Sequence, residues 1–162
     1  MGQKNISKYM QEAVRLAEKS IPSAHPNPAV GAVITKNNKV IGKGRNSHYG
    51  GAHAELNAIK SVKQKKLLVG ATLYTTLEPC SHTGKTPPCI DAIIQSGIRK
   101  VIVGIIDPDK NVSGTGLKAL KQAGLIIKIG DGSVIVKSQL RAYIYNRTAQ
   151  LPFITAKLAA SI

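Results

Sequence analysis

Residues 77–89 read Leu77-Glu78-Pro79-Cys80-Ser81-His82-Thr83-Gly84-Lys85-Thr86-Pro87-Pro88-Cys89, and His53-Ala54-Glu55 precedes them in the chain. His53, Cys80 and Cys89 together offer one nitrogen and two thiolate sulfurs, a set of ligands that suits Zn²⁺. Three protein ligands leave the fourth tetrahedral position free, as in catalytic zinc sites. We therefore predict that these three residues bind one zinc ion.

The segments around these residues predict how the ligands meet. Residues 71–77 are apolar and β-branched and predict a buried strand, whereas residues 54–59 favour a helix. A further helix is expected over 89–94, because Pro88 is tolerated at the start of a helix. The N-terminus of a helix carries partial positive charge, which favours a thiolate. Two helix starts could thus face one ion.

Glu55 is the predicted catalytic residue. It follows His53 by two residues, near enough to exchange a proton with a water at the metal without binding the metal. Histidine-x-glutamate followed by proline-cysteine is typical of zinc nucleobase deaminases. Taken singly, His-Ala-Glu is usually an ordinary helix start, and cysteines are usually apolar fillers. The occurrence of His-Ala-Glu and both cysteines in one chain favours a zinc site over these separate interpretations. His82 is a rival ligand, which we interpret as a loop residue.

The rest of the chain predicts an alternation of strands and helices. Helices are expected over 6–17, 117–123 and much of 134–145, and strands over 29–35, 40–42, 100–106 and 125–129. With the elements around the metal ligands, this gives five strands and five helices. The fold class is therefore α/β, a three-layer α/β/α domain with a central five-stranded mixed sheet.

Composition narrows the function classes. The chain has 162 residues, 43% of them hydrophobic, and no apolar run long enough to cross a bilayer, so one folded domain with no membrane partner is expected. Two cysteines are too few for a disulfide framework, which favours a cytoplasmic protein. The net charge of +15 attracts phosphate groups, carried either by a metabolite or by a nucleic acid.

The sequence resembles the riboflavin-biosynthesis pyrimidine deaminases, which are diaminohydroxyphosphoribosylaminopyrimidine deaminases of the cytidine-deaminase-like superfamily. The matching motifs are Pro26-Asn27-Pro28, Val30-Gly31, Gly42-x-Gly44, His53-Ala54-Glu55, residues 77–89 and Asp107-Pro108. Eight residues separate the two cysteines, whereas other zinc deaminases typically have two. The resemblance implies hydrolytic deamination of a phosphoribosylated diaminopyrimidine, with release of ammonia.

The resemblance also implies substrate-binding residues. It assigns Asn27, Lys85 and Asp107 to contacts with the substrate. The family usually has histidine where this chain has Asn46, and His48 could substitute for it. A second departure is Asp109, where the family tends to asparagine. A negative charge there disfavours a phosphorylated substrate unless a lysine compensates.

Residues 151–158 read as a linker and another strand, which suggests a second domain. We expect a deaminase domain over 1–148, followed over 149–162 by a linker and the start of a reductase domain that is otherwise absent. NADPH is expected as a cofactor only if that reductase is present elsewhere. The resemblance also implies a homo-oligomer.

Two alternatives stay open. A nucleic-acid base deaminase of the transfer-RNA type is suggested by the net charge and by the cluster Lys60, Lys63, Lys65 and Lys66. Only 4% of residues are aromatic, which leaves few side chains to stack on bases and makes nucleic acid an improbable partner. The other alternative is a noncatalytic zinc domain, against which the presence of Glu55 argues.

Overall fold

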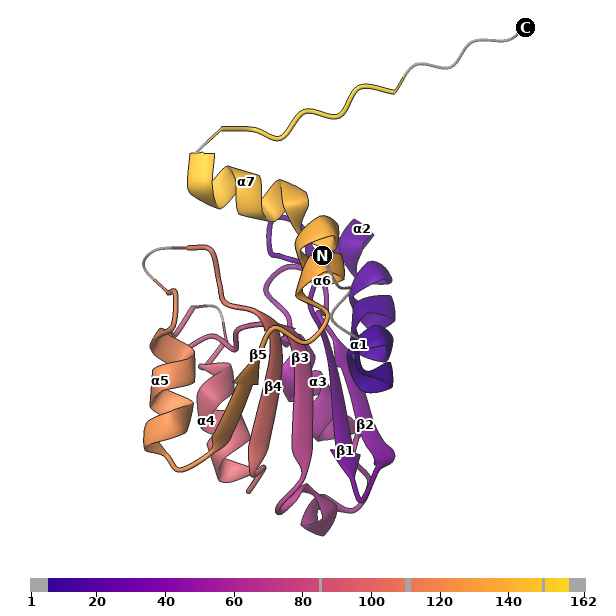
Figure 1. The fold of residues 1–162 in the computed structure, drawn as a ribbon, viewed down its shortest axis with the longest axis vertical. Helices are drawn as coiled ribbons and strands as arrows, with labels where there is room; N and C mark the ends of the chain where they lie inside the picture. Colours follow the sequence, from indigo (N-terminus) through magenta and orange to yellow (C-terminus); the bar gives the residue numbers. More distant parts are fainter. Residues whose placement is uncertain (1–5, 85, 110–111, 150, 158–162) are drawn as a thin grey trace, which may run out of the picture.

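A five-stranded mixed sheet forms the centre of the computed structural model, which describes residues 6–84, 86–109, 112–149 and 151–157 (Figure 1). The strands are β1 (Gly31–Lys36), β2 (Lys39–Arg45), β3 (Thr72–Leu77), β4 (Lys100–Ile105) and β5 (Ile126–Ile129). Their order in the sheet is β2-β1-β3-β4-β5. β1 is antiparallel to β2 and β3, whereas β3, β4 and β5 are parallel. The predicted mixed sheet is thus confirmed.

Helices cover both faces of the sheet. They are α1 (Lys8–Glu18), α2 (Ile21–Ala24), α3 (Ala54–Ser61), η1 (Lys65–Leu68), α4 (Cys89–Gln95), α5 (Thr115–Gln122), α6 (Ser133–Gln139) and α7 (Arg141–Ala149). α1 and α6 contact each other and the sheet, and α3, α4 and α5 form a contiguous layer on the opposite face. The predicted three-layer α/β/α architecture is confirmed. None of the helices in the described ranges is long and apolar enough to cross a membrane.

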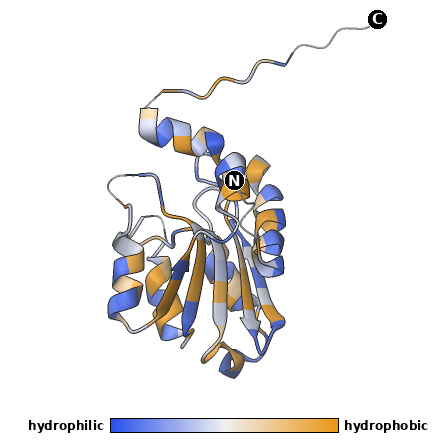
Figure 2. Cartoon of the chain, viewed as in Figure 1, coloured by the Kyte–Doolittle hydropathy of each residue, from blue (hydrophilic) through white to orange (hydrophobic). Residues whose placement is uncertain are grey.

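Apolar residues concentrate in the strands, whereas the helices mix hydrophobic and hydrophilic residues (Figure 2). Side chains alternate between the faces of a strand. In β1, Val33 accordingly packs with Met10 of α1, while Ala32 and Ile34 belong to the larger core cluster. Burial of these side chains supplies the main driving force for folding.

Two glycines of β2 fix the position of α3. A Cβ atom on Gly44 would lie 2.2 Å from the carbonyl oxygen of Ala54 and 2.3 Å from the amide nitrogen of Ala58. A Cβ atom on Gly42 would lie 2.6 Å from the carbonyl oxygen of Ala58. Only residues without a Cβ let the helix backbone approach the strand this closely. The motif Gly42-x-Gly44 therefore places the N-terminus of α3, which begins after His53.

The C-terminal region differs from the expectation. Residues 133–149 form two helices, because Leu140, buried with φ −94° and ψ 13°, interrupts the helical path between α6 and α7. None of the residues of α7 is buried, and this helix projects beyond the sheet (Figure 1). The expected strand over 151–158 was wrong for 151–157, which form none; residue 158 lies outside the described ranges. A strand needs a neighbouring strand to satisfy its backbone hydrogen bonds.

Candidate active site

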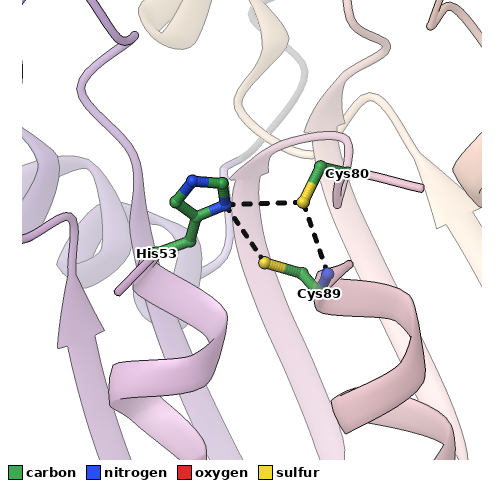
Figure 3. Close-up of side chains that lie close together, drawn as sticks. All are labelled: His53, Cys80 and Cys89. Atoms are coloured by element: carbon green, nitrogen blue, oxygen red, sulfur yellow. Dashed lines mark hydrogen bonds between the residues drawn. The ribbon is translucent and has the colours of Figure 1, made fainter. Parts of the chain in front are cut away.

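Three elements bring the predicted metal ligands together (Figure 3). His53 is the N-cap of α3, Cys80 follows β3, and Cys89 is the first residue of α4. The Nδ1 atom of His53 lies 3.4 Å from Cys80 Sγ and 3.3 Å from Cys89 Sγ. The three ligand atoms all lie within 4.8 Å of one another.

This donor set fits Zn²⁺. Zinc binds sulfur at about 2.3 Å and nitrogen at about 2.0 Å, and tetrahedral bonds of these lengths place nitrogen and sulfur about 3.6 Å apart. The two nitrogen–sulfur separations are close to that value. One imidazole and two thiolates would leave one tetrahedral position open, which suits a catalytic rather than a structural zinc.

Hydrogen bonds prepare Cys80 to act as a ligand. Hydrogen bonds from the Cys89 thiol, from His53 and from the backbone N–H of Cys89 lower the pKa of Cys80 to about 4, although burial opposes the shift. The Cys89 N–H lies at the start of α4 and donates to Cys80 Sγ at 3.3 Å. The pKa of Cys89 is raised, because its thiol donates to Cys80 and is buried. The pKa of His53 is raised by its hydrogen bond with Cys80. Cys80 is therefore a thiolate at neutral pH, the form that binds metals.

Glu55 lies in the first turn of α3 and is only 3% exposed. Burial raises the pKa of its carboxyl group. Its Oε1 atom lies 3.1 Å from the hydroxyl of Thr75 in β3. Glu55, His53 and Cys80 line the same pocket. A carboxyl group whose pKa is raised by burial is suited to accept a proton and to give it back.

The pocket has a volume of about 590 Å³, within the range of small-molecule sites. Of the residues predicted to bind substrate, Asn27, Asn46 and Asp107 line it. His48 is exposed and is not among the lining residues that the structure describes. Lys85 lies outside the described residues. The structure therefore gathers three of these five side chains around the metal group.

The side chain of Asn46 forms hydrogen bonds with two backbone groups. Its Oδ1 atom accepts a hydrogen bond from the N–H of Ala54 at 3.2 Å, and its Nδ2 atom donates to the carbonyl oxygen of Pro28 at 3.1 Å. The amide thus caps α3 and joins it to the turn that carries Asn27.

The structure adds Glu78, which the sequence reasoning quoted in the motif but gave no role. Its buried carboxylate accepts hydrogen bonds from the N–H groups of Asp107, Gly114, Gly116 and Leu117, at 3.1, 2.9, 3.0 and 3.4 Å. The N-cap of α5 is Gly114, which has no side chain to cap the helix. Glu78 therefore caps α5 from the end of β3. The one signal of this role in the sequence was Gly114, which cannot cap α5 with a side chain of its own.

Asp107 follows β4 and accepts from two sides. Its Oδ1 atom lies 2.9 Å from the N–H of Asp109 and 3.2 Å from the hydroxyl of Tyr143 in α7. Burial raises the pKa of Asp107. Tyr143 and Arg147 also line the pocket, so α7 contributes to the site. Sequence reasoning missed both residues.

The comparisons with known proteins agree with this geometry. The family described as "Cytidine and deoxycytidylate deaminase zinc-binding region" matches residues 3–105. The chain is 45% identical over 154 residues to riboflavin biosynthesis protein RibD of Chlamydia trachomatis, which covers 95% of this chain and 40% of that protein. It therefore spans about two fifths of the length of this relative and of similar ones.

A shorter relative is matched over most of its length. The diaminohydroxyphosphoribosylamino-pyrimidine deaminase of Buchnera aphidicola subsp. Schizaphis graminum is 48% identical over 122 residues, which are 75% of this chain and 82% of that protein. The solved bifunctional deaminase/reductase of Thermotoga maritima is 42% identical, with a TM-score of 0.84 over 90% of this chain and 42% of that one. The chain therefore belongs to the zinc-binding cytidine and deoxycytidylate deaminase family and, within it, to the riboflavin-biosynthesis pyrimidine deaminases.

Proposed function

We propose that the chain catalyses the zinc-dependent hydrolytic deamination of the phosphoribosylated diaminopyrimidine intermediate of riboflavin biosynthesis, releasing ammonia. The observation that carries the proposal is that buried Glu55 lines one pocket together with His53 and Cys80, which form the metal-ligand group with Cys89. The similarity to the diaminohydroxyphosphoribosylamino-pyrimidine deaminase of Buchnera aphidicola, at 48% identity, supports the choice of substrate.

His53, Cys80 and Cys89 would hold the zinc ion, which supplies Lewis acidity that activates water at neutral pH. Glu55 accepts a proton from the attacking water as the new carbon–oxygen bond forms. It then delivers that proton to the ring amino group, so that the carbon–nitrogen bond breaks and ammonia leaves. Burial keeps this exchange away from bulk water and raises the pKa of Glu55, which favours proton return.

Asn27 and Asp107 are proposed to orient the pyrimidine. The Asn27 amide offers both a donor and an acceptor, which suits the polar edge of a pyrimidine ring. Asp107 is tethered by Asp109 and Tyr143, so its carboxylate enters the pocket in a fixed position. We also propose that Lys85, His48 and Asn46 contact the substrate.

We further propose that the chain works as a homo-oligomer in the cytoplasm, and that residues 149–162 lead toward a reductase domain. NADPH then concerns only that reductase.

Ammonia release tests the choice of substrate. Zinc-loaded protein is assayed with the phosphoribosylated diaminopyrimidine and, in parallel, with transfer RNA and with cytidine. We expect turnover of the diaminopyrimidine alone. Turnover of RNA that falls steeply with added salt, with none of the diaminopyrimidine, would replace the proposal with a nucleic-acid deaminase.

A further inference from the structure

Helix α7 meets the loop after β4 at the rim of the pocket. The Nη1 atom of Arg147 lies 3.7 Å from Asp109 Oδ2, and its guanidinium lies 5.4 Å from the centre of the Tyr143 ring. Tyr143 in turn donates its hydroxyl proton to Asp107. All four side chains line the pocket. Two contacts therefore connect α7 to two carboxylates at the pocket rim.

Acidic residues outnumber lysines and arginines among the described residues that line the pocket. Among the lining residues that the structure describes, four carry carboxyl groups: Glu55, Glu78, Asp107 and Asp109. Within the same described set, Arg147 is the one lysine or arginine. The carboxylate of Glu78 is held by four backbone N–H groups. Asp109 also lines the pocket, and 23% of its side chain is exposed.

A phosphate group that enters this pocket meets the negative charge of Asp109. Like charges repel, and the repulsion is stronger at a partly buried rim than in bulk water. The positive charge of the Arg147 guanidinium offsets the charge of Asp109. Its side chain is 45% exposed, so the pair remains accessible from the pocket mouth.

We propose that Arg147 is a specificity-determining residue that neutralises Asp109, so that the pocket accepts a phosphate-bearing substrate. The inference rests on the proposed function for the identity of that substrate. It also makes α7, which lies outside the matched residues 3–105, a part of the site. The sequence predicts that a lysine compensates the charge of Asp109, and among the described lining residues the cation paired with Asp109 is Arg147.

Four variants test the proposal: Arg147→Met, Asp109→Asn, the double variant with both changes, and Arg141→Met. Arg141 belongs to the same helix and carries the same charge, but it lies near the Phe153 ring and is not a lining residue. It therefore reports any long-range effect of removing one positive charge. Since α7 buries no residue, the changes at Arg147 and Arg141 should leave the melting temperature unchanged.

Two readouts separate this proposal from the proposed function. The first is the KM for the phosphoribosylated diaminopyrimidine and for its dephosphorylated form. Arg147→Met should raise the first KM about fivefold, with kcat within about twofold, and leave the second KM unchanged. The second readout is the Kd of ribose 5-phosphate, measured calorimetrically without turnover. Arg147→Met should weaken this binding by a similar factor.

Asp109→Asn should restore both values in the double variant, and Arg141→Met should change neither. The proposal is overturned if the double variant stays as weak as Arg147→Met, if both forms of the substrate lose affinity equally, or if the parent does not bind ribose 5-phosphate. A parent that binds ribose 5-phosphate with this mutational pattern but releases no ammonia would retain the role of Arg147 and reject the proposed function.

Discussion

Glu55 and Thr75 form a buried side-chain contact in which Oε1 of the glutamate lies 3.1 Å from Oγ1 of the threonine. Thr75 is completely buried in β3, and its Oγ1 atom also lies 3.1 Å from the carbonyl oxygen of Leu77. A hydroxyl has one proton to donate and can also accept. Thr75 therefore fixes the direction of the Glu55 carboxyl group from the floor of the site.

Replacing Thr75 with valine should lower kcat about tenfold, with KM within about twofold, because the carboxyl group loses its fixed direction but the pocket keeps its shape. Thr75→Ser should restore most of the activity. Steady-state kinetics on zinc-loaded protein give both constants.

Thr76→Val is the matched control. Thr76 is the next residue of β3, is equally buried, and accepts a hydrogen bond from the N–H of Gly31 instead. This variant should lose stability but keep its kcat. Equal loss of kcat in the two valine variants would show that Thr75 acts only through folding.

Cys80→Ser should abolish zinc binding and activity together, because a serine hydroxyl is not ionised at neutral pH. Metal content by mass spectrometry under native conditions measures the first effect. His82→Ala is the control, since His82 lines the pocket but is not in the group of three ligands. Zinc retained by Cys80→Ser and lost by His82→Ala would mean that the ligands are wrongly assigned.

Glu78→Gln should lower the free energy of unfolding by about 2 kcal/mol, because one buried carboxylate oxygen that accepts backbone N–H groups becomes a donor. Denaturant titration measures the change. Asp91→Asn provides the comparison, since Asp91 is an acidic residue in the first turn of α4 but is exposed. An effect of Glu78→Gln no larger than that of Asp91→Asn would contradict the role as a cap.

The protonation of Asp107 should make the free energy of unfolding fall as the pH rises. Burial, the first cause, raises the pKa of Asp107 in the folded protein, with smaller contributions from the charges of Asp109 and Glu78. The folded state therefore binds this proton more tightly than the unfolded state. The stabilisation from protonation is complete below the unfolded pKa, near 4, and is lost as the pH rises through the higher folded pKa.

Asp107→Asn removes this dependence, since its amide oxygen can still accept from Asp109 and Tyr143. The variant should gain stability relative to the parent as the pH rises from about 4 to 7, while its activity falls. Unfolding curves at a series of pH values measure the difference. A relative gain in stability on acidification would have the opposite sign and would contradict the raised pKa.

Local patterns in the sequence explain which parts of the fold were predictable. His53, Glu55, Cys80 and Cys89 lie at helix starts or strand ends, where glycine, proline and alternation mark the boundaries. Each boundary depends on neighbours in the chain. The five strands followed from the same kind of local signal.

Other features depend on residues far apart in the chain. Glu78 caps a helix that begins at Thr115, and Arg147 meets Asp109 across the pocket rim. No local pattern reports such a pairing, because it arises only when the sheet and its helices pack. The break between α6 and α7 was also missed, because no glycine or proline marks Leu140, the buried residue at which the backbone departs from helical angles.

The most direct test of the account compares zinc-loaded parent and Glu55→Gln in ammonia release from the phosphoribosylated diaminopyrimidine. Zinc content and melting temperature are measured on the same samples. Glu55 carries the proton in both halves of the proposed reaction, so the variant should keep its zinc and lose at least about a hundredfold in kcat. Unchanged turnover by a folded, zinc-bound Glu55→Gln protein would contradict the proposed chemistry.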